Sequence, residues 1–524
     1  MDAVGLMLGL AGTLEQCLRH GRALVHFCRD LRNLSNTIDE MSFIIENIWQ
    51  KMEEQVKLLR KIWDDPSLLP PLLQSHYAVT ISHLDKKLLV ALDSLEKCRT
   101  RRILHTSQFA RVKTLYLTKD LKKIVADLET WQQRFDPSWY MITLLSTSKI
   151  DEQLQSETDP STKRLVQIRK SIRSISNRRY DDDELIFKPS TSITGTRKLL
   201  PGTNTYILSD YNGAQVLLDR TNYGRNADPQ TVKDNVSDLA RQFSHVDPGS
   251  FGLLKCIGAV EIRLQDSAST IQASQKTQFE FIFQVPDGLH SPKTLRDILL
   301  SQERVSLTKR MKLAKQLARS VMFVHTTGFV HKGIRPETIV VFEDKNSEIG
   351  PSFLIGFERI RHAQGQTDLI GDLEWQKNLY RHPHRQGLWP EKAFKMQHDI
   401  YSLGVCLLEV ALWKSFVLCE PVENTSEQYP WSDLKIEDAI RGRNSGRGGR
   451  AMKEQLITIT KERLASLVGD QYTNLVLACL HCLDPDSENN VFEGSASGAR
   501  DDDEIGIGVR YIENILLKLE DLFV

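Results

Sequence analysis

The chain has no excess charge of either sign. Its 524 residues include 68 lysines and arginines against 68 aspartates and glutamates, so the formal net charge at pH 7 is zero. Such a balance gives no general attraction for the phosphate backbone of a nucleic acid. We therefore expect no nucleic-acid partner, and any electrostatic function must come from a local patch of charge.

Cysteine is scarce, with eight residues over the whole length. This density does not build a disulfide framework, and reduced, mostly buried thiols are expected. Cys479 and Cys482 form the one close pair, and without a second pair at matching spacing they are interpreted as packing on a helix. His382 and His384 are separated by a proline and are weak evidence for a metal. We expect no metal site and no cofactor.

Long hydrophobic runs are also missing. The apolar run from Ala3 to Leu14 is shorter than the roughly 20 residues that span a bilayer. It also lacks the basic region and the cleavage pattern of a secretory signal. We expect a cytoplasmic protein in the resting state.

Residues 1–150 instead repeat apolar side chains at three- and four-residue steps. Such stripes predict long amphipathic helices. The stripes are Met41, Ile45, Ile48, Met52, Val56, Leu59 and Trp63; Leu73, Tyr77, Ile81, Leu84, Leu88, Leu92 and Leu95; and Leu117, Leu121, Ile124, Leu128, Trp131 and Phe135. Prolines within 66–71 separate the first two helices, and Asp136-Pro137 is expected to end the third. The prediction is an all-α bundle of four or more helices.

The first segment differs from these stripes because it combines apolar residues with glycine. Gly5, Gly9 and Gly12 each cost an exposed helix about 1 kcal/mol, so helix propensity does not explain them. Small residues permit close packing, either within the bundle or against other helices in lipid. The membrane-insertion candidates are Val4, Leu6, Leu8 and Leu10.

The opening MDAVGLMLGLAGTL, followed by helical repeats, resembles the fungal HeLo domain of prion-inhibition and propagation proteins of the HET-s type. The resemblance covers residues 1–150. It implies a helical domain that exposes its N-terminal segment when triggered and damages membranes. A first helix that is only part of the bundle core is the alternative.

A basic connector follows in residues 151–200. Its positive residues include Lys163, Arg169, Lys170 and Arg173, and apolar residues fall on one helical face between them. A basic amphipathic helix either lies on an anionic membrane surface or docks as a clamp between domains. The acidic and Ser/Thr-rich remainder of the connector is typical of a flexible linker.

The segment from Phe329 to Phe342 reads FVHKGIRPETIVVF. It resembles the catalytic loop of protein kinases, in which H-R-D-x-K-P-E-N precedes a short apolar strand. His331 keeps its place, and Arg335 keeps a positive charge where the family has lysine. Gly333 replaces the aspartate that accepts the substrate proton, and Thr338 replaces the asparagine that holds magnesium.

Other kinase positions show the same pattern of loss. Gly356 stands where the family has a metal-binding aspartate, although Phe357 after it is kept. Gly213 is alone in a hairpin that normally has several glycines, and the strand that ends at Thr221 offers no lysine. Asp399, in the run HDIYSLG, matches the aspartate that holds the catalytic loop. The resemblance implies an α+β, bilobal protein-kinase-like domain over residues 201–524, and a pseudokinase rather than an enzyme.

The whole plan, a multidomain chain with a helix bundle before a pseudokinase, is similar to that of mixed lineage kinase domain-like proteins. The resemblance implies a cell-death effector in which the pseudokinase restrains a membrane-permeabilising bundle. Expected partners are an upstream receptor protein, other copies of the chain after activation, and lipids of the plasma membrane. An atypical ATP-binding kinase and a signalling adaptor without enzyme activity remain as alternatives.

Overall fold

The structure of the protein is a computed structural model. It describes residues 3–32, 34–63, 68–100, 107–144, 150, 186–193, 195–221, 228–264, 276–301, 303–345, 347–357, 361–362, 374–387, 390, 392–422, 425–441, 446–492 and 500–522. The chain divides into two compact units, Met1–Arg169 with Ala499–Val509 and Lys170–Gly498 with Arg510–Val524.

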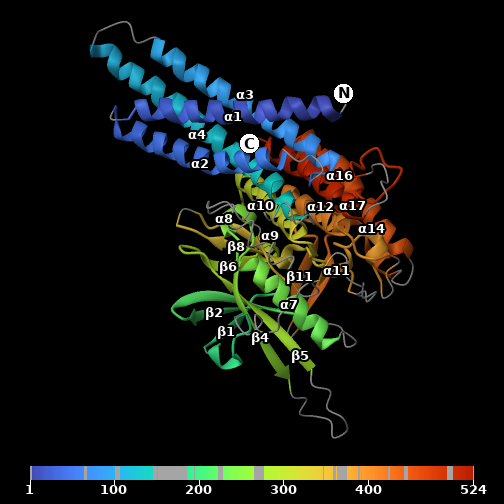
Figure 1. Ribbon diagram of the computed structural model, residues 1–524. Helices are drawn as coiled ribbons and strands as arrows, with labels where there is room; N and C mark the ends of the chain where they lie inside the picture. Colours follow the sequence, from blue (N-terminus) through green and yellow to red (C-terminus); the bar gives the residue numbers. More distant parts are fainter. Residues whose placement is uncertain are drawn as a thin grey trace. The chain divides into compact units, whose positions relative to one another are not determined.

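Four long helices form the N-terminal unit, drawn in blue to cyan in Figure 1. They are α1 (Ala3–Asp30), α2 (Asn36–Trp63), α3 (Pro71–Thr100) and α4 (Ser107–Tyr140), followed by the 3₁₀ turn η3 (Met141–Leu144). Helix α1 packs against α2 and α3, and α4 packs against the same two helices. Among the described residues, no helix combines the length and the apolar character needed to cross a bilayer.

The predicted stripes make the core of this bundle. Every member is buried except Leu92, which is half-buried. The expectation that Asp136-Pro137 ends the last helix is wrong, since α4 continues to Tyr140. The Asp136 carboxylate accepts hydrogen bonds from Lys51 Nζ at 2.8 Å and Gln55 Nε2 at 3.1 Å, and these contacts with α2 hold the final turn.

Glycine in α1 has two different surroundings. A Cβ at Gly21 would lie 2.0 Å from the Trp49 ring, so Gly21 lets α1 approach α2 closely. A Cβ at Gly12 would meet nothing within 4 Å. Close packing therefore explains Gly21 and not Gly12 in this bundle.

The kinase-like unit begins with a five-stranded antiparallel sheet in the order β1-β2-β3-β5-β4. The strands are β1 (Arg197–Leu199), β2 (Thr205–Tyr211), β3 (Ala214–Arg220), β4 (Lys255–Leu264) and β5 (Lys276–Gln284). Asn212 and Gly213 have φ angles of 53° and 83° in the turn between β2 and β3, as the Asn-Gly signal predicts. One helix, α7 (Pro229–Phe243), packs against β4 and β5.

The elements that follow are mainly helical and form the larger lobe of a kinase-like, bilobal α+β domain. Helix α10 packs against α12, and α12 against α16. The helices are α8 (Pro248–Phe251), α9 (Leu295–Leu300), α10 (Leu307–Thr326), α11 (Trp375–Asn378), α12 (Met396–Leu412), α13 (Glu437–Arg441), α14 (Gly446–Ile459), α15 (Ala465–Val468), α16 (Asp470–Leu480) and α18 (Leu517–Glu520). Helix α17 (Arg500–Tyr511) lies mostly within the segment Ala499–Val509 that belongs to the N-terminal unit. The strands are β6 (His290–Thr294), β7 (Phe329–Val330), β8 (Ile339–Glu343), β9 (Ser352–Leu354), β10 (Arg361–His362), β11 (Val417–Val422) and β12 (Thr425–Pro430).

Candidate functional site

The loop of residues 331–338 lies between β7 and β8, and a side chain of α12 anchors its backbone. The Asp399 carboxylate, in the first turn of α12, is fully buried. It accepts hydrogen bonds from the backbone N–H of His331 at 2.8 Å and of Lys332 at 3.0 Å. This is the position that the HDIYSLG run predicts for Asp399. Two charge-assisted bonds from a buried carboxylate make the loop a fixed part of the larger lobe.

Phe357 connects this loop to the smaller lobe through aromatic contacts. Its ring centroid lies 4.8 Å from that of His331 and 5.0 Å from that of Phe243, the last residue of α7. A third contact, at 6.1 Å, reaches Phe283 in β5. The resulting column passes from the loop through the kept phenylalanine to the smaller lobe. These contacts join the loop, Phe357 and the smaller lobe by aromatic packing.

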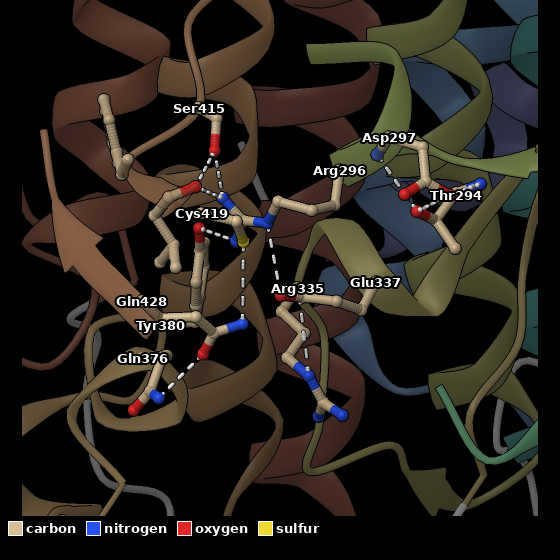
Figure 2. Close-up of polar contacts among 12 residues, drawn as sticks. Thr294, Arg296, Asp297, Arg335, Glu337, Gln376, Tyr380, Ser415, Cys419 and Gln428 are labelled. Carbon is tan, nitrogen blue, oxygen red and sulfur yellow. Dashed lines mark hydrogen bonds and ion pairs between the residues drawn. The ribbon is translucent and has the colours of Figure 1, made fainter. Parts of the chain in front are cut away.

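A buried arginine also holds the loop, through an ion pair with Glu337 (Figure 2). Arg296, in α9, lies 3.2 Å from a carboxylate oxygen of Glu337 in the loop and 3.2 Å from one of Glu409 in α12. Its Nη2 also donates to the Tyr380 hydroxyl at 2.6 Å. Burial opposes ionisation of Glu337, but the charges of Arg296 and Arg335 outweigh it and lower the Glu337 pKa. Burial raises the pKa of Glu409 to about 7, although Arg296 counteracts it.

The most unusual side chain of the centre is Asp219 in β3. Val216-Leu-Leu-Asp219 follows the V-A-I-K pattern of kinases, with aspartate in the place of lysine. Asp219 Oδ2 accepts hydrogen bonds from the backbone N–H of Gly356 at 2.9 Å and of Phe357 at 3.0 Å. Its Oδ1 accepts one from the Thr205 hydroxyl at 2.9 Å. A buried anion therefore lies where an active kinase has a cation for the nucleotide phosphates.

Gly356 and Thr338 lie so close together that there is no room for a Cβ at position 356. Gly356 has a φ of 82°, and a Cβ there would lie 2.4 Å from Thr338 Cγ2. Thr338 is itself fixed by its hydroxyl. The hydroxyl accepts a hydrogen bond from the backbone N–H of Arg335 at 3.1 Å and donates one to the Gly333 carbonyl oxygen at 3.0 Å. An aspartate at 356 would need both a strained backbone and a displaced loop.

The other positions at which the chain departs from the kinase pattern either contact neighbouring residues or face open space. A Cβ at Gly333 would lie 3.4 Å from Arg335 Nη1, which leaves space at the site of the missing catalytic aspartate. The Thr221 hydroxyl donates to the Phe279 carbonyl at 3.0 Å within the sheet. Gly213 faces open space in its turn. Arg220 pairs with the buried Glu280 of the neighbouring strand at 2.7 Å.

The predicted membrane residues belong to the other unit. Val4, Leu6, Leu8 and Leu10 are in the helical backbone of α1, and their side chains lie outside the described part of the chain. The basic patch of Lys163, Arg169, Lys170 and Arg173 also lies outside the described residues. Both assignments therefore remain predictions.

Sequence reasoning missed Asp219 and Arg296. The absence of lysine from β3 was visible in the sequence, but the acid in its place was not recognised as a ligand for backbone amides. Arg296 gave no signal, since its partners Glu337 and Glu409 follow 41 and 113 residues later. The substitution of one charge for its opposite at a motif position is the signal that identifies Asp219.

Comparisons with known proteins agree with this geometry. No family model matches the chain. The C-terminal region is similar to serine/threonine kinases.

The eIF-2-alpha kinase of Rattus norvegicus is 24% identical over 186 residues, which are 32% of this chain and 11% of that protein. A serine/threonine-protein kinase-like protein of Arabidopsis thaliana is 27% identical over 187 residues, 33% of this chain and 50% of its own. A probable serine/threonine-protein kinase of Clostridium acetobutylicum is 25% identical over 126 residues, 23% of this chain and 17% of its own. The chain thus spans half or less of each relative.

Proposed function

We propose that the C-terminal unit is a pseudokinase that transfers no phosphoryl group and instead controls the N-terminal helix bundle. The observation that carries the first half of this proposal is the Asp219 carboxylate on the amides of Gly356 and Phe357. Phosphoryl transfer depends almost wholly on positioned positive charge, supplied by lysine and magnesium, and on a base. Asp219 supplies the opposite charge at the lysine position.

The neighbouring positions support the same conclusion. Gly333 offers no base, Gly356 offers no carboxylate for magnesium, and the Thr338 hydroxyl already donates to backbone carbonyl oxygens of its own loop. The aromatic column and the bonds to Asp399 nevertheless keep the centre assembled. A domain that keeps this packing without the charges is suited to a conformational role.

The second half of the proposal concerns the bundle. After release, α1 would present its apolar first turns to the cytoplasmic face of the plasma membrane, and several copies would assemble and permeabilise it. Gly12 supports this role, since no atom of the described residues lies within 4 Å of a Cβ placed there. An upstream receptor protein would shift the population by binding the latched and released states differently.

A phosphotransfer assay tests the enzymatic half. The full chain should transfer no phosphate from ATP and magnesium to a generic protein substrate or to itself. The Asp219→Lys variant should also be inactive, because Gly356 still lacks the metal-binding carboxylate and Gly333 still lacks the base. Turnover by the unaltered chain that Gly333→Pro abolishes would reject the pseudokinase assignment in favour of an atypical kinase.

Dye release from vesicles containing anionic lipid tests the effector half. The full chain should release little dye, and Asp219→Ala should release more because it loosens the centre that we propose acts as the latch. Adding Leu8→Asp to that variant should abolish release, since a charge is costly in a bilayer. A folded Asp219→Ala chain that leaves vesicles intact would instead favour a signalling adaptor.

A further inference from the structure

Three histidines lie together at the start of α12. His382 and His384 flank Pro383 at the turn η7 (Pro383–Arg385), and His398 is in the first turn of α12. One ring nitrogen from each lies within 4.8 Å of the others. The ring centroids of His382 and His384 are 4.4 Å apart, and those of His382 and His398 are 6.0 Å apart. The sequence showed only the first two as a pair.

Two of these imidazoles are almost fully buried. His382 and His398 are each 2% exposed, so a metal ion that they bind would be shielded from water.

The surroundings of His398 fit a metal ligand. Its Nε2 is buried and has no hydrogen-bond partner among the described residues. Its Nδ1 accepts a hydrogen bond from the Lys395 backbone N–H at 2.8 Å and lies 3.3 Å from the Lys395 carbonyl oxygen. With Nε2 on a metal, the ring would take the other tautomer, and Nδ1–H would donate to that oxygen in place of the present bond. The buried Tyr401 hydroxyl beside His382 also lacks a partner among the described residues.

The charge around His382 is partly compensated. Asp484 Oδ1 lies 3.9 Å from His382 Nε2, so a carboxylate stands behind this ring. The nearest cation, Lys453 Nζ, is 3.3 Å from the same nitrogen, but it is also 2.7 Å from Asp484 Oδ2. The ion pair between Lys453 and Asp484 reduces the repulsion that a metal ion would meet.

We propose that His382, His384 and His398 bind one divalent transition-metal ion of the zinc type, which fastens the η7 segment to α12. Three nitrogen ligands suit zinc and leave a fourth position for water. Zinc–nitrogen bonds of about 2.0–2.1 Å bring ligand nitrogens to about 3.4 Å of one another, so the three rings would draw closer on binding. The site adjoins Asp399, the residue after His398, but it uses none of the loop's groups and does not depend on the proposed function.

Metal titration of the full chain tests the site. After treatment with a chelator, the wild type should bind one zinc per chain, and cobalt(II) should give the visible absorption of a tetrahedral site. His384→Ala and His398→Gln should each weaken binding by more than the roughly 100-fold that loss of an outer partner costs. The exposed His290 provides a matched control, and His290→Ala should bind as the wild type does.

Melting curves separate ligand loss from misfolding. His384 is only half-buried, so His384→Ala should melt as the wild type does without metal and should lose the stabilisation by zinc. Two results would overturn the proposal: no saturable binding by the folded wild type, or unchanged binding by a folded His384→Ala chain. Either would identify the three histidines as a packing cluster of the larger lobe.

Discussion

Gly356 lies at a position where the packing leaves no room for the aspartate of the kinase pattern. Gly356→Ala should destabilise the chain because the new Cβ meets Thr338 Cγ2 at 2.4 Å and the backbone has a φ of 82°. Gly213→Ala is a matched control, with a φ of 83° and open space. The left-handed backbone costs each variant about 1–2 kcal/mol, and overpacking adds about 1–3 kcal/mol at Gly356 alone. Calorimetric melting of both variants measures the difference.

Thr338→Ser provides the second check at this position, since it removes Cγ2 and keeps the hydroxyl. It should restore part of the stability that Gly356→Ala loses and should do nothing for Gly213→Ala. Equal costs for the two glycine variants, or no recovery with serine, would show that the contact between Gly356 and Thr338 carries no constraint.

The sequence predicts single residues where a motif specifies the neighbour. Asp399 is placed correctly because the run HDIYSLG and the loop at His331 belong to one known pattern. The role of Asp219 was not predicted because its amide partners lie 137 and 138 residues away. A local sequence does not state which backbone N–H groups the fold brings to a side chain.

Arg296 shows how one buried group joins separate elements. Arg296→Met would leave the buried Glu409 carboxylate without its cation and Glu337 with Arg335 alone, at a cost of about 3–5 kcal/mol. Lys293→Met, which breaks the exposed pair with Glu343, should cost less than about 1 kcal/mol. Denaturation of both variants gives the comparison, and similar costs would contradict the role given to Arg296.

The pH dependence of the Arg296→Met effect has a definite sign. Arg296 lowers the pKa of both Glu337 and Glu409, so its removal raises both values in the folded state. The folded variant would then bind more protons than its unfolded chain, and its stability would fall as pH rises. The cost of Arg296→Met should therefore be smaller at pH 5 than at pH 8.

Helix α1 supplies a second pair of matched glycines. Gly21→Ala should destabilise the bundle by about 1–3 kcal/mol because its Cβ would meet the buried ring of Trp49 at 2.0 Å. Gly12→Ala has open space and should stabilise the helix by up to about 1 kcal/mol. Hydrogen exchange of α1 peptides distinguishes the two outcomes. Equal protection in both variants would refute the close approach of α1 to α2.

At this scale the sequence predicted the helices better than their ends. The stripes of α2, α3 and α4 were found because burial on one face imposes a period that the sequence displays directly. The end of α4 was predicted too early because Asp136-Pro137 is a local stop signal. The helix continues past this signal because Asp136 accepts hydrogen bonds from Lys51 and Gln55, which lie more than 80 residues earlier in the chain.

For the whole molecule, we propose that the kinase-like unit keeps its fold without binding ATP and magnesium in the manner of an active kinase. The most direct measurement is the melting temperature of the full chain with increasing ATP and magnesium. A ligand at about 100 times its Kd would raise the free energy of unfolding by about 2.7 kcal/mol. We predict no shift for the wild type at millimolar ATP and magnesium. A saturable rise in melting temperature that requires magnesium and is lost in Asp219→Ala would contradict the account.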